Sequence, residues 1–195
     1  MLKSPDAGGD TIEQEIVAGG KLGAVLQNYP KILIAAVNGA AIGWGCTQLY
    51  NFDLVYASRR AVFQTPFTSL GFAPEGGSSY TFPKIMGKHH ANRLLIASDK
   101  LTAEEMYISG YVTQVLDEKN FVDQVCAIAK RIGGYDSEGL KAVKKLTSNA
   151  QELEERRAAG KQEGEALARL LNRPEAKAKM AEFAGKSKKA GPSKL

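Results

Sequence analysis

The stretch KILIAAVNGAAIGWGC, residues 31–46, joins an apolar run to a turn built of small residues. Residues 32–37 are apolar and partly β-branched, and a run of this length predicts a buried strand. Residues 38–45 contain three glycines and predict a tight turn, with a helix expected at about 46–50. A strand, a glycine-rich turn and a helix in this order favour an α/β fold.

Strands and helices continue to alternate on both sides of this stretch. A helix is expected from Asp10 or Thr11 to about Asn28, where Pro30 ends it. Thr102 and Glu105 have the spacing of a capping box. The remaining expected elements are strands at 52–57, 61–64 and 111–116, a loop at 65–78, and helices at 79–86, 89–97 and 103–109.

The pattern from about Asn120 onward is helical only. Breaks are expected at Gly133-Gly134, Asn149, Pro174 and Gly185. An α/β core followed by helices predicts three regions. They are a core at 1–135, a helical oligomerisation region at 136–185 and a flexible tail at 186–195.

Composition excludes several classes of protein. The net charge is +5 over 195 residues, but the lysines and arginines crowd the segment from Lys141 onward without interleaved aromatics, so we expect no nucleic-acid partner. No run approaches the roughly 20 apolar residues of a membrane helix. Adjacent His89 and His90 make poor metal ligands, and Cys46 and Cys126 have no CxxC spacing, so we expect free thiols and no metal.

A second glycine-rich turn, Pro74-Glu75-Gly76-Gly77-Ser78-Ser79, is expected to open a helix. Glycines let backbone N–H groups approach a ligand closely, and a helix N-terminus adds partial positive charge. Neither turn is a GxGxxG or Walker motif. From the residues alone, both turns are open between tight packing and ligand binding. Glu75 is likewise open between a solvated turn residue and a catalytic carboxylate.

Longer segments resemble a known family. Residues 31–46, followed by Phe52-Asp-Leu-Val-Tyr-Ala-Ser, resemble the core pattern of the crotonase (enoyl-CoA hydratase/isomerase) superfamily. Residues 61–87 resemble its peroxisomal Δ3,Δ2-enoyl-CoA isomerase branch, and the resemblance extends over about 20–185. It implies a crotonase-like spiral of β-β-α units with a helical C-terminal region.

The resemblance also implies a reaction, the conversion of 3-enoyl-CoA to 2-trans-enoyl-CoA in β-oxidation of unsaturated fatty acids. Acyl-CoA is the substrate and no further cofactor is expected. Glu75 is the expected general base and acid, and the Trp44 backbone N–H an expected oxyanion donor. An apolar wall would raise the pKa of Glu75. The expected substrate-binding residues are Ala40, Ile42, Gly43, Phe67, Leu70, Phe72, Pro74 and Gly76, and Phe67, Leu70 and Phe72 form the expected wall.

Two alternatives to the isomerase are kept. Hydratases of the family use two glutamates at positions that here hold Thr47 and Phe67, which disfavours an enoyl-CoA hydratase. Family members also carry an earlier Ser- or Ala-Gly-x-Asp turn that supplies the other oxyanion N–H. Residues 7–10, Ala-Gly-Gly-Asp, follow no predicted strand. We therefore expect a fold that is incomplete at the N-terminus, and a catalytically silent acyl-CoA-binding or assembly protein stays an alternative.

The last three residues, Ser193, Lys194 and Leu195, match the peroxisomal address that an import receptor reads. We expect a peroxisomal location and the import receptor as a partner. The resemblance implies a homo-oligomer, a trimer or hexamer, with helices of the region 136–184 at its interfaces.

Overall fold

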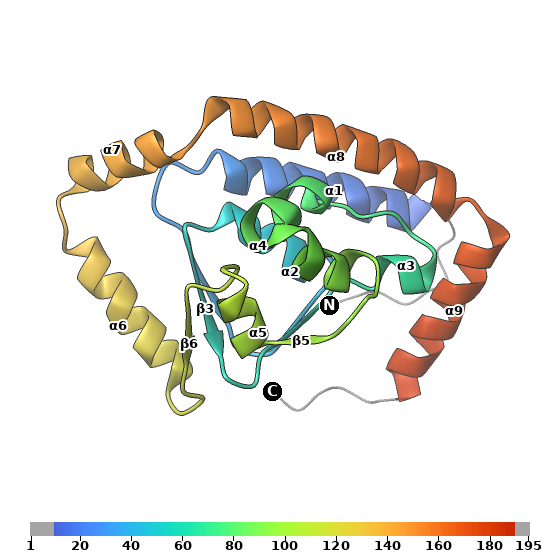
Figure 1. Ribbon diagram of the computed structural model, residues 1–195, viewed down its shortest axis with the longest axis horizontal. Coiled ribbons are helices and arrows are strands. Elements are labelled where there is room, and N and C mark those ends of the chain that lie inside the picture. The colour runs from blue at the N-terminus through green and yellow to red at the C-terminus, as the bar shows by residue number, and fades with distance from the viewer. Residues whose placement is uncertain (1–9, 190–195) are drawn as a thin grey trace.

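The computed structural model describes residues 10–189, and two small sheets form the centre of the molecule (Figure 1). The first sheet has the order β1-β3-β6, and both of its strand pairs are parallel. The second has the order β2-β4-β5, with β2 and β4 parallel and β5 antiparallel to β4. The strands are β1 (Ile34–Val37), β2 (Ala40–Ile42), β3 (Leu54–Ser58), β4 (Val62–Gln64), β5 (Leu101–Thr102) and β6 (Gln114–Leu116).

Helices surround these sheets, and those at the C-terminal end form an outer layer (Figure 1). The helices are α1 (Asp10–Gln27), α2 (Trp44–Thr47), the 3₁₀ helix η1 (Gln48–Asn51), α3 (Phe67–Leu70), α4 (Ser78–Leu95), α5 (Ala103–Ile108), α6 (Phe121–Gly133), α7 (Ser137–Thr147), α8 (Ala150–Leu171) and α9 (Pro174–Lys189). Helix α8 packs on α4, and α9 packs on α3. The C-terminal helices therefore lie over the elements that follow β4.

The main hydrophobic core lies between the two sheets and helices α4 and α5. Phe63 of β4, Phe82 of α4 and Met106 of α5 have no exposed surface. The ring of Phe82 meets Tyr111 edge to face, with ring centroids 5.1 Å apart. Tyr111 in turn donates a hydrogen bond of 2.9 Å to the carbonyl of Cys46, which fixes α2 against the core.

The predicted α/β class is confirmed by the structure. The capping box is confirmed as well, because Glu105 N–H donates to Thr102 Oγ1 and Thr102 N–H donates to Glu105 Oε2. Helix α4 covers both helices predicted at 79–86 and 89–97, with Gly87 outside helical geometry between them. The three-region division stays a prediction.

Several predicted boundaries are wrong. Strand β2 occupies residues expected to be a turn, and α3 lies inside the expected loop 65–78. The short strand β2 forms because it pairs with β4, a partner that the local sequence does not specify. Helix α9 continues through Gly185, because a glycine costs a helix only about 1 kcal/mol.

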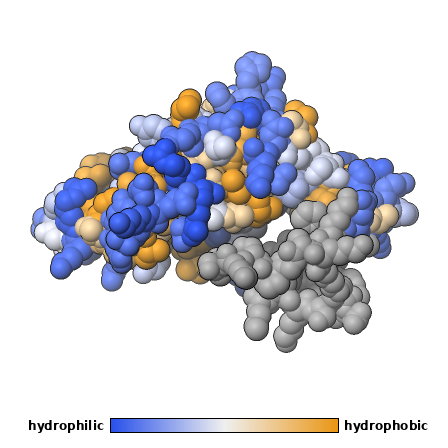
Figure 2. All heavy atoms as spheres, turned by 90° about the horizontal axis from the view of Figure 1, so that it is seen from below, coloured by the Kyte–Doolittle hydropathy of each residue, from blue (hydrophilic) through white to orange (hydrophobic). Residues whose placement is uncertain are grey.

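The surface mixes apolar and polar side chains. Figure 2 shows hydrophobic groups scattered among hydrophilic ones on one face, part of which lies behind grey atoms. Within residues 10–189, no helix is both long enough and apolar enough to cross a bilayer. The predicted targeting tripeptide, residues 193–195, lies outside the described part of the chain.

Candidate active site

The two glycine-rich turns meet because β2 and β4 are parallel neighbours. Ile42 at the end of β2 is in register with Gln64 at the end of β4. The Gly43 N–H donates a hydrogen bond of 2.8 Å to the Gln64 carbonyl, which closes this edge of the sheet. The carboxyl ends of adjacent parallel strands form the usual crevice for a ligand in open α/β sheets.

Helix α2 begins immediately after the first turn. Gly43 has a φ of 56°, a conformation that favours glycine, and its carbonyl accepts the N–H groups of Cys46 and Thr47. Trp44 is the first residue of the helix, so its N–H has no acceptor inside the helix. This N–H is available to an oxygen of a ligand, and it sits at the positive end of the helix backbone.

Glu75 lies at the start of the second turn, against α2. It is half-buried, and its Oε1 accepts a hydrogen bond of 2.7 Å from the hydroxyl of the fully buried Thr47. Gly76 and Gly77 follow with φ values of 71° and 77°. At Gly76 a Cβ atom would lie 2.8 Å from Thr47 Oγ1, so only glycine lets the turn approach α2 this closely.

The surroundings of Glu75 raise its pKa from the ordinary 4.5 to about 7. Burial is the main cause, because it removes water from the charged form. The hydrogen bond from Thr47 lowers the pKa and so opposes burial, while the negative charge of Glu163 raises it further. A carboxylate with a pKa near 7 can both take and return a proton at neutral pH.

A cavity of about 870 Å³ opens over Glu75 and Trp44. Helices α1 and α8, at the top of Figure 1, both contribute to its lining. Small residues from these helices leave it wide. Its lining includes Ala18, Gly19, Gly20, Gly23 and Ala24 of α1, Gly160 and Gly164 of α8, and Gln48 and Asn51 of η1.

The structure brings together four of the ten predicted site residues. Trp44, Phe67, Glu75 and Gly76 line the cavity. Of the three side chains predicted to form an apolar wall, only Phe67 does so. Phe72 packs against the main core instead, and Leu70 belongs to α3, which packs on α9. The predicted residues that do not line the cavity are Ala40, Ile42, Gly43, Leu70, Phe72 and Pro74.

Three charged residues of α8 line the cavity and were not predicted from the sequence, namely Arg156, Arg157 and Glu163, and two of them contact the second turn. Glu163 is only 5% exposed and lies within hydrogen-bonding distance of the second turn. Arg156 has its guanidinium 4.9 Å from the centre of the Tyr50 ring, and its Nη2 lies 3.5 Å from the Gly76 carbonyl. Both lie about 80 residues after the turn, in a helix of mostly charged and small residues, and no local pattern marks them.

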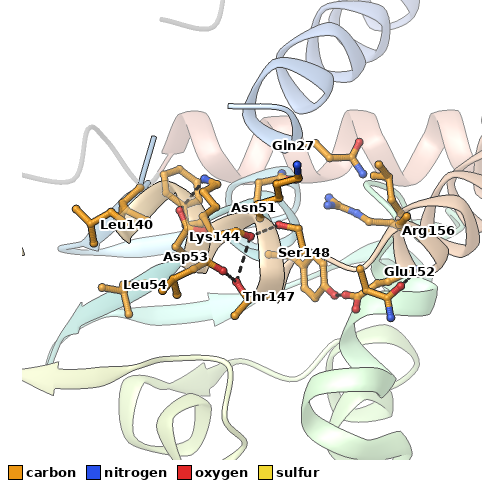
Figure 3. A pocket seen from close by; sticks show the side chains of 18 of the residues that line it. Gln27, Asn51, Asp53, Leu54, Leu140, Lys144, Thr147, Ser148, Glu152 and Arg156 are labelled. Atoms are coloured by element: carbon orange, nitrogen blue, oxygen red, sulfur yellow. Dashed lines mark hydrogen bonds and ion pairs between the residues drawn. The ribbon is translucent and has the colours of Figure 1, made fainter. Parts of the chain in front are cut away.

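A second cavity of about 860 Å³ is lined in part by residues of η1, α7 and α8 (Figure 3). Gln27, Asn51 and Arg156 line both cavities. Lys144 points into the second cavity but donates to Asp53 Oδ2 at 2.8 Å and to the Lys31 carbonyl at 2.7 Å. The charge of Lys144 is therefore already balanced by Asp53.

Metal chemistry has no donor set in the part of the chain that the structure describes. Residues 10–189 contain no group of three or more His, Cys, Asp or Glu side chains placed to hold an ion. The thiol of Cys46 is buried, and burial raises its pKa well above the ordinary value. A raised pKa keeps this thiol protonated and poorly nucleophilic. Glu75, in contrast, lines the first cavity with a pKa raised to about 7.

The sequence pattern of the enoyl-CoA hydratase/isomerase family matches residues 14–190. The chain belongs to this family. Among solved structures, the enoyl-CoA hydratase/isomerase of Pseudoalteromonas atlantica T6c superposes with a TM-score of 0.79 at 34% identity. The alignment covers 85% of this chain and 66% of that one.

Curated relatives within the family include isomerases. Human enoyl-CoA delta isomerase 2 is 46% identical over 61% of this chain and 30% of its own length. Mouse enoyl-CoA delta isomerase 3, peroxisomal, is 48% identical over 50% of this chain and 31% of its own length. Human testis-specific chromodomain protein Y 2 is 44% identical over 60% of this chain and 22% of its own length. The chain thus matches about a third or less of each relative.

Proposed function

We propose that the chain isomerises 3-enoyl-CoA to 2-trans-enoyl-CoA, with Glu75 as the single acid–base residue. The observation that carries this proposal is the half-buried carboxylate in the cavity, whose pKa of about 7 suits proton transfer in both directions. The isomerase names of two relatives support the same reaction.

The reaction needs one proton carrier and one site for negative charge. Glu75 takes a proton from C2 of the substrate, and the electrons move into the thioester carbonyl to give a dienolate. The Trp44 N–H donates to the oxygen on which this charge develops. Protonated Glu75 then returns the proton at C4, and the double bond comes to lie between C2 and C3. No water enters the product.

A hydratase needs further groups to activate and add water. The two positions at which hydratases of the family carry glutamates hold Thr47 and Phe67, and neither is an acid or a base. The Thr47 hydroxyl already donates a hydrogen bond to Glu75. A double-bond shift requires one proton carrier and one oxyanion donor, and Glu75 and the Trp44 N–H are the groups of the cavity that we assign to these roles.

A catalytically silent acyl-CoA-binding or assembly protein is the second candidate. One observation favours it, since a relative of 44% identity has a name that states no isomerase activity. Overall identity therefore does not separate the two candidates. The two candidates are distinguished by whether Glu75 transfers a proton on a bound acyl-CoA.

The test supplies 3-enoyl-CoA and follows formation of 2-enoyl-CoA, then supplies 2-enoyl-CoA and follows addition of water. Glu75→Gln should lower isomerisation by about 10²- to 10⁴-fold with acyl-CoA affinity retained, since an amide of similar size has no basic oxygen. Glu118→Gln, at an exposed position outside the cavity, is the control. Acyl-CoA binding without turnover in the wild type would support the silent protein. Hydration without a double-bond shift would support a hydratase.

We further propose a peroxisomal location and a homo-oligomer. The terminal Ser193, Lys194 and Leu195 and the peroxisomal isomerase among the relatives support the location. The exposed apolar side chains Tyr135, Val143 and Leu146, on and before α7, support a contact with a second copy in the helical region.

A further inference from the structure

Glu163 of α8 is a buried carboxylate that the proposed reaction does not use. Its Oε2 accepts the Gly77 N–H and its Oε1 accepts the Ser79 N–H, both at 2.7 Å. The side chain is 5% exposed and reaches back across 86 and 84 positions of sequence. Both carboxylate oxygens are thus bonded to the turn that carries Glu75.

These bonds supply the missing cap of α4. Gly77 is the N-cap residue of α4 and has no side chain to accept the free N–H groups of the first turn. Hydrogen bonds to an ionised carboxylate are short and strong, and negative charge at a helix N-terminus is favourable. Glu163 therefore fixes the backbone two residues after Glu75. Gly76 and Gly77 both have positive φ and wide conformational freedom, and the hydrogen bonds to Glu163 restrict this part of the turn.

The two carboxylates share one electrostatic environment. Glu163 and the guanidinium of Arg156 face the turn from α8, and the hydroxyl of Thr47 faces Glu75 from α2. Cys46 belongs to α2, and the Tyr111 hydroxyl donates to its carbonyl. Burial is the main cause that raises the pKa of both the Cys46 thiol and the Tyr111 hydroxyl, and the charge of Glu75 adds to it. Among these groups, Glu163 carries the negative charge that raises the pKa of Glu75.

We propose that Glu163 is a positioning residue for Glu75, which fixes the turn from α8 and places a second negative charge beside the base. This inference rests on the proposed function, because it gives Glu75 the role of proton carrier. It makes α8 part of the catalytic apparatus through the hydrogen bonds of Glu163 to the turn. The negative charge of Glu163 raises the pKa of Glu75, because a nearby like charge disfavours ionisation of the second carboxyl.

The experiment compares three full-length variants with the wild type. Glu163→Gln keeps the size but removes the charge and one of the two acceptor oxygens. Glu163→Asp keeps the charge on a side chain that is too short to make both bonds. Glu165→Gln removes an exposed charge from the same helix and is the matched control. The readouts are the pH dependence of kcat/KM for 3-enoyl-CoA, the ¹³C NMR titration of the Glu75 carboxyl, assigned through Glu75→Gln, and amide hydrogen exchange at Gly77 and Ser79.

In Glu163→Gln we expect the Glu75 titration and the acid limb of kcat/KM to move to lower pH together. Exchange at Gly77 and Ser79 should quicken, and kcat should fall about tenfold or more as the base loses its position. Glu163→Asp should quicken exchange and lower kcat while leaving the titration near that of the wild type. Glu165→Gln should change none of these.

A glutamine variant whose Glu75 titration matches the wild type would overturn the proposal, because a merely structural cap changes stability and exchange alone. If the glutamine variant does not fold, an aspartate variant with wild-type exchange and wild-type kcat overturns it instead. The proposed function fails separately, when the wild type lacks turnover or Glu75→Gln keeps it. The NMR titration and the amide exchange need no turnover, so they decide the role of Glu163 in either case.

Discussion

Thr47 Oγ1 donates a hydrogen bond of 2.7 Å to Glu75 Oε1, which joins helix α2 to the second glycine-rich turn. The resemblance to the family places Thr47 where its hydratases carry a glutamate. The hydroxyl cannot act as an acid or base at neutral pH, but it stabilises the charged form of Glu75 by hydrogen bonding. Thr47 therefore lowers the pKa of the proposed base, against the larger upward effect of burial.

Thr47→Val should move the acid limb of isomerisation to higher pH. Valine has a similar shape but cannot donate a hydrogen bond, and the bond from Thr47 is what lowers the pKa of Glu75 against burial. The measurement is kcat/KM across pH 5 to 9. Thr147→Val, at an exposed position of α7, should leave the profile unchanged. A limb that moves to lower pH would contradict this account of the hydrogen bond.

Glu75 should make the protein less stable as pH rises from about 4.5 to 7. Its pKa is near 4.5 in the unfolded chain and about 7 in the folded one, so in this window the folded state keeps a proton that the unfolded state has released. Its favourable contribution is complete below pH 4.5 and is lost above about 7. Glutamine at this position does not titrate. The thermal midpoint of Glu75→Gln, relative to that of the wild type, should therefore be higher at pH 8 than at pH 5. An equal difference at both pH values would show that the pKa is not raised.

Gly76→Ala should destabilise the protein by about 1–3 kcal/mol and lower turnover. The residue has a φ of 71°, and the new Cβ would lie 2.8 Å from Thr47 Oγ1. The turn must move away from α2, which breaks the hydrogen bond between Thr47 and Glu75. Denaturant unfolding measures the loss of stability. Gly133→Ala, on α6 with open space around its Cβ, should be neutral or stabilising by about 0.5–1 kcal/mol. Equal effects of the two substitutions would refute the steric argument.

Deletion of Leu195 should abolish peroxisomal import. With a fluorescent protein fused ahead of residue 1, the intact chain should give a punctate pattern and the shortened chain a diffuse one, because the receptor reads the terminal tripeptide. Import of both forms to the same extent would remove the support for this location.

Much of the secondary structure follows from local chemistry. The apolar residues 32–37 predict a strand, and β1 lies within them at Ile34–Val37. The capping box at Thr102 and Glu105 is predicted from two residue types at one spacing, and its hydrogen bonds are present. The local sequence predicts no strand at β2, because these three residues form a strand only when β4 lies beside them.

The candidate site divides in the same way. Two glycine-rich turns, the place of Glu75 in the second and the role that the resemblance gives it can all be read from the chain, since backbone freedom and family motifs are local properties. The hydrogen bonds of Thr47 to Glu75 and of Glu163 to the same turn are known only from the folded structure. It also shows that Phe67, a residue of the core, lines the cavity, while the partly buried Phe72 packs against the core outside that lining. These contacts join residues far apart in the chain, so they depend on how α8 and α2 pack around the turn, which no short stretch of sequence specifies.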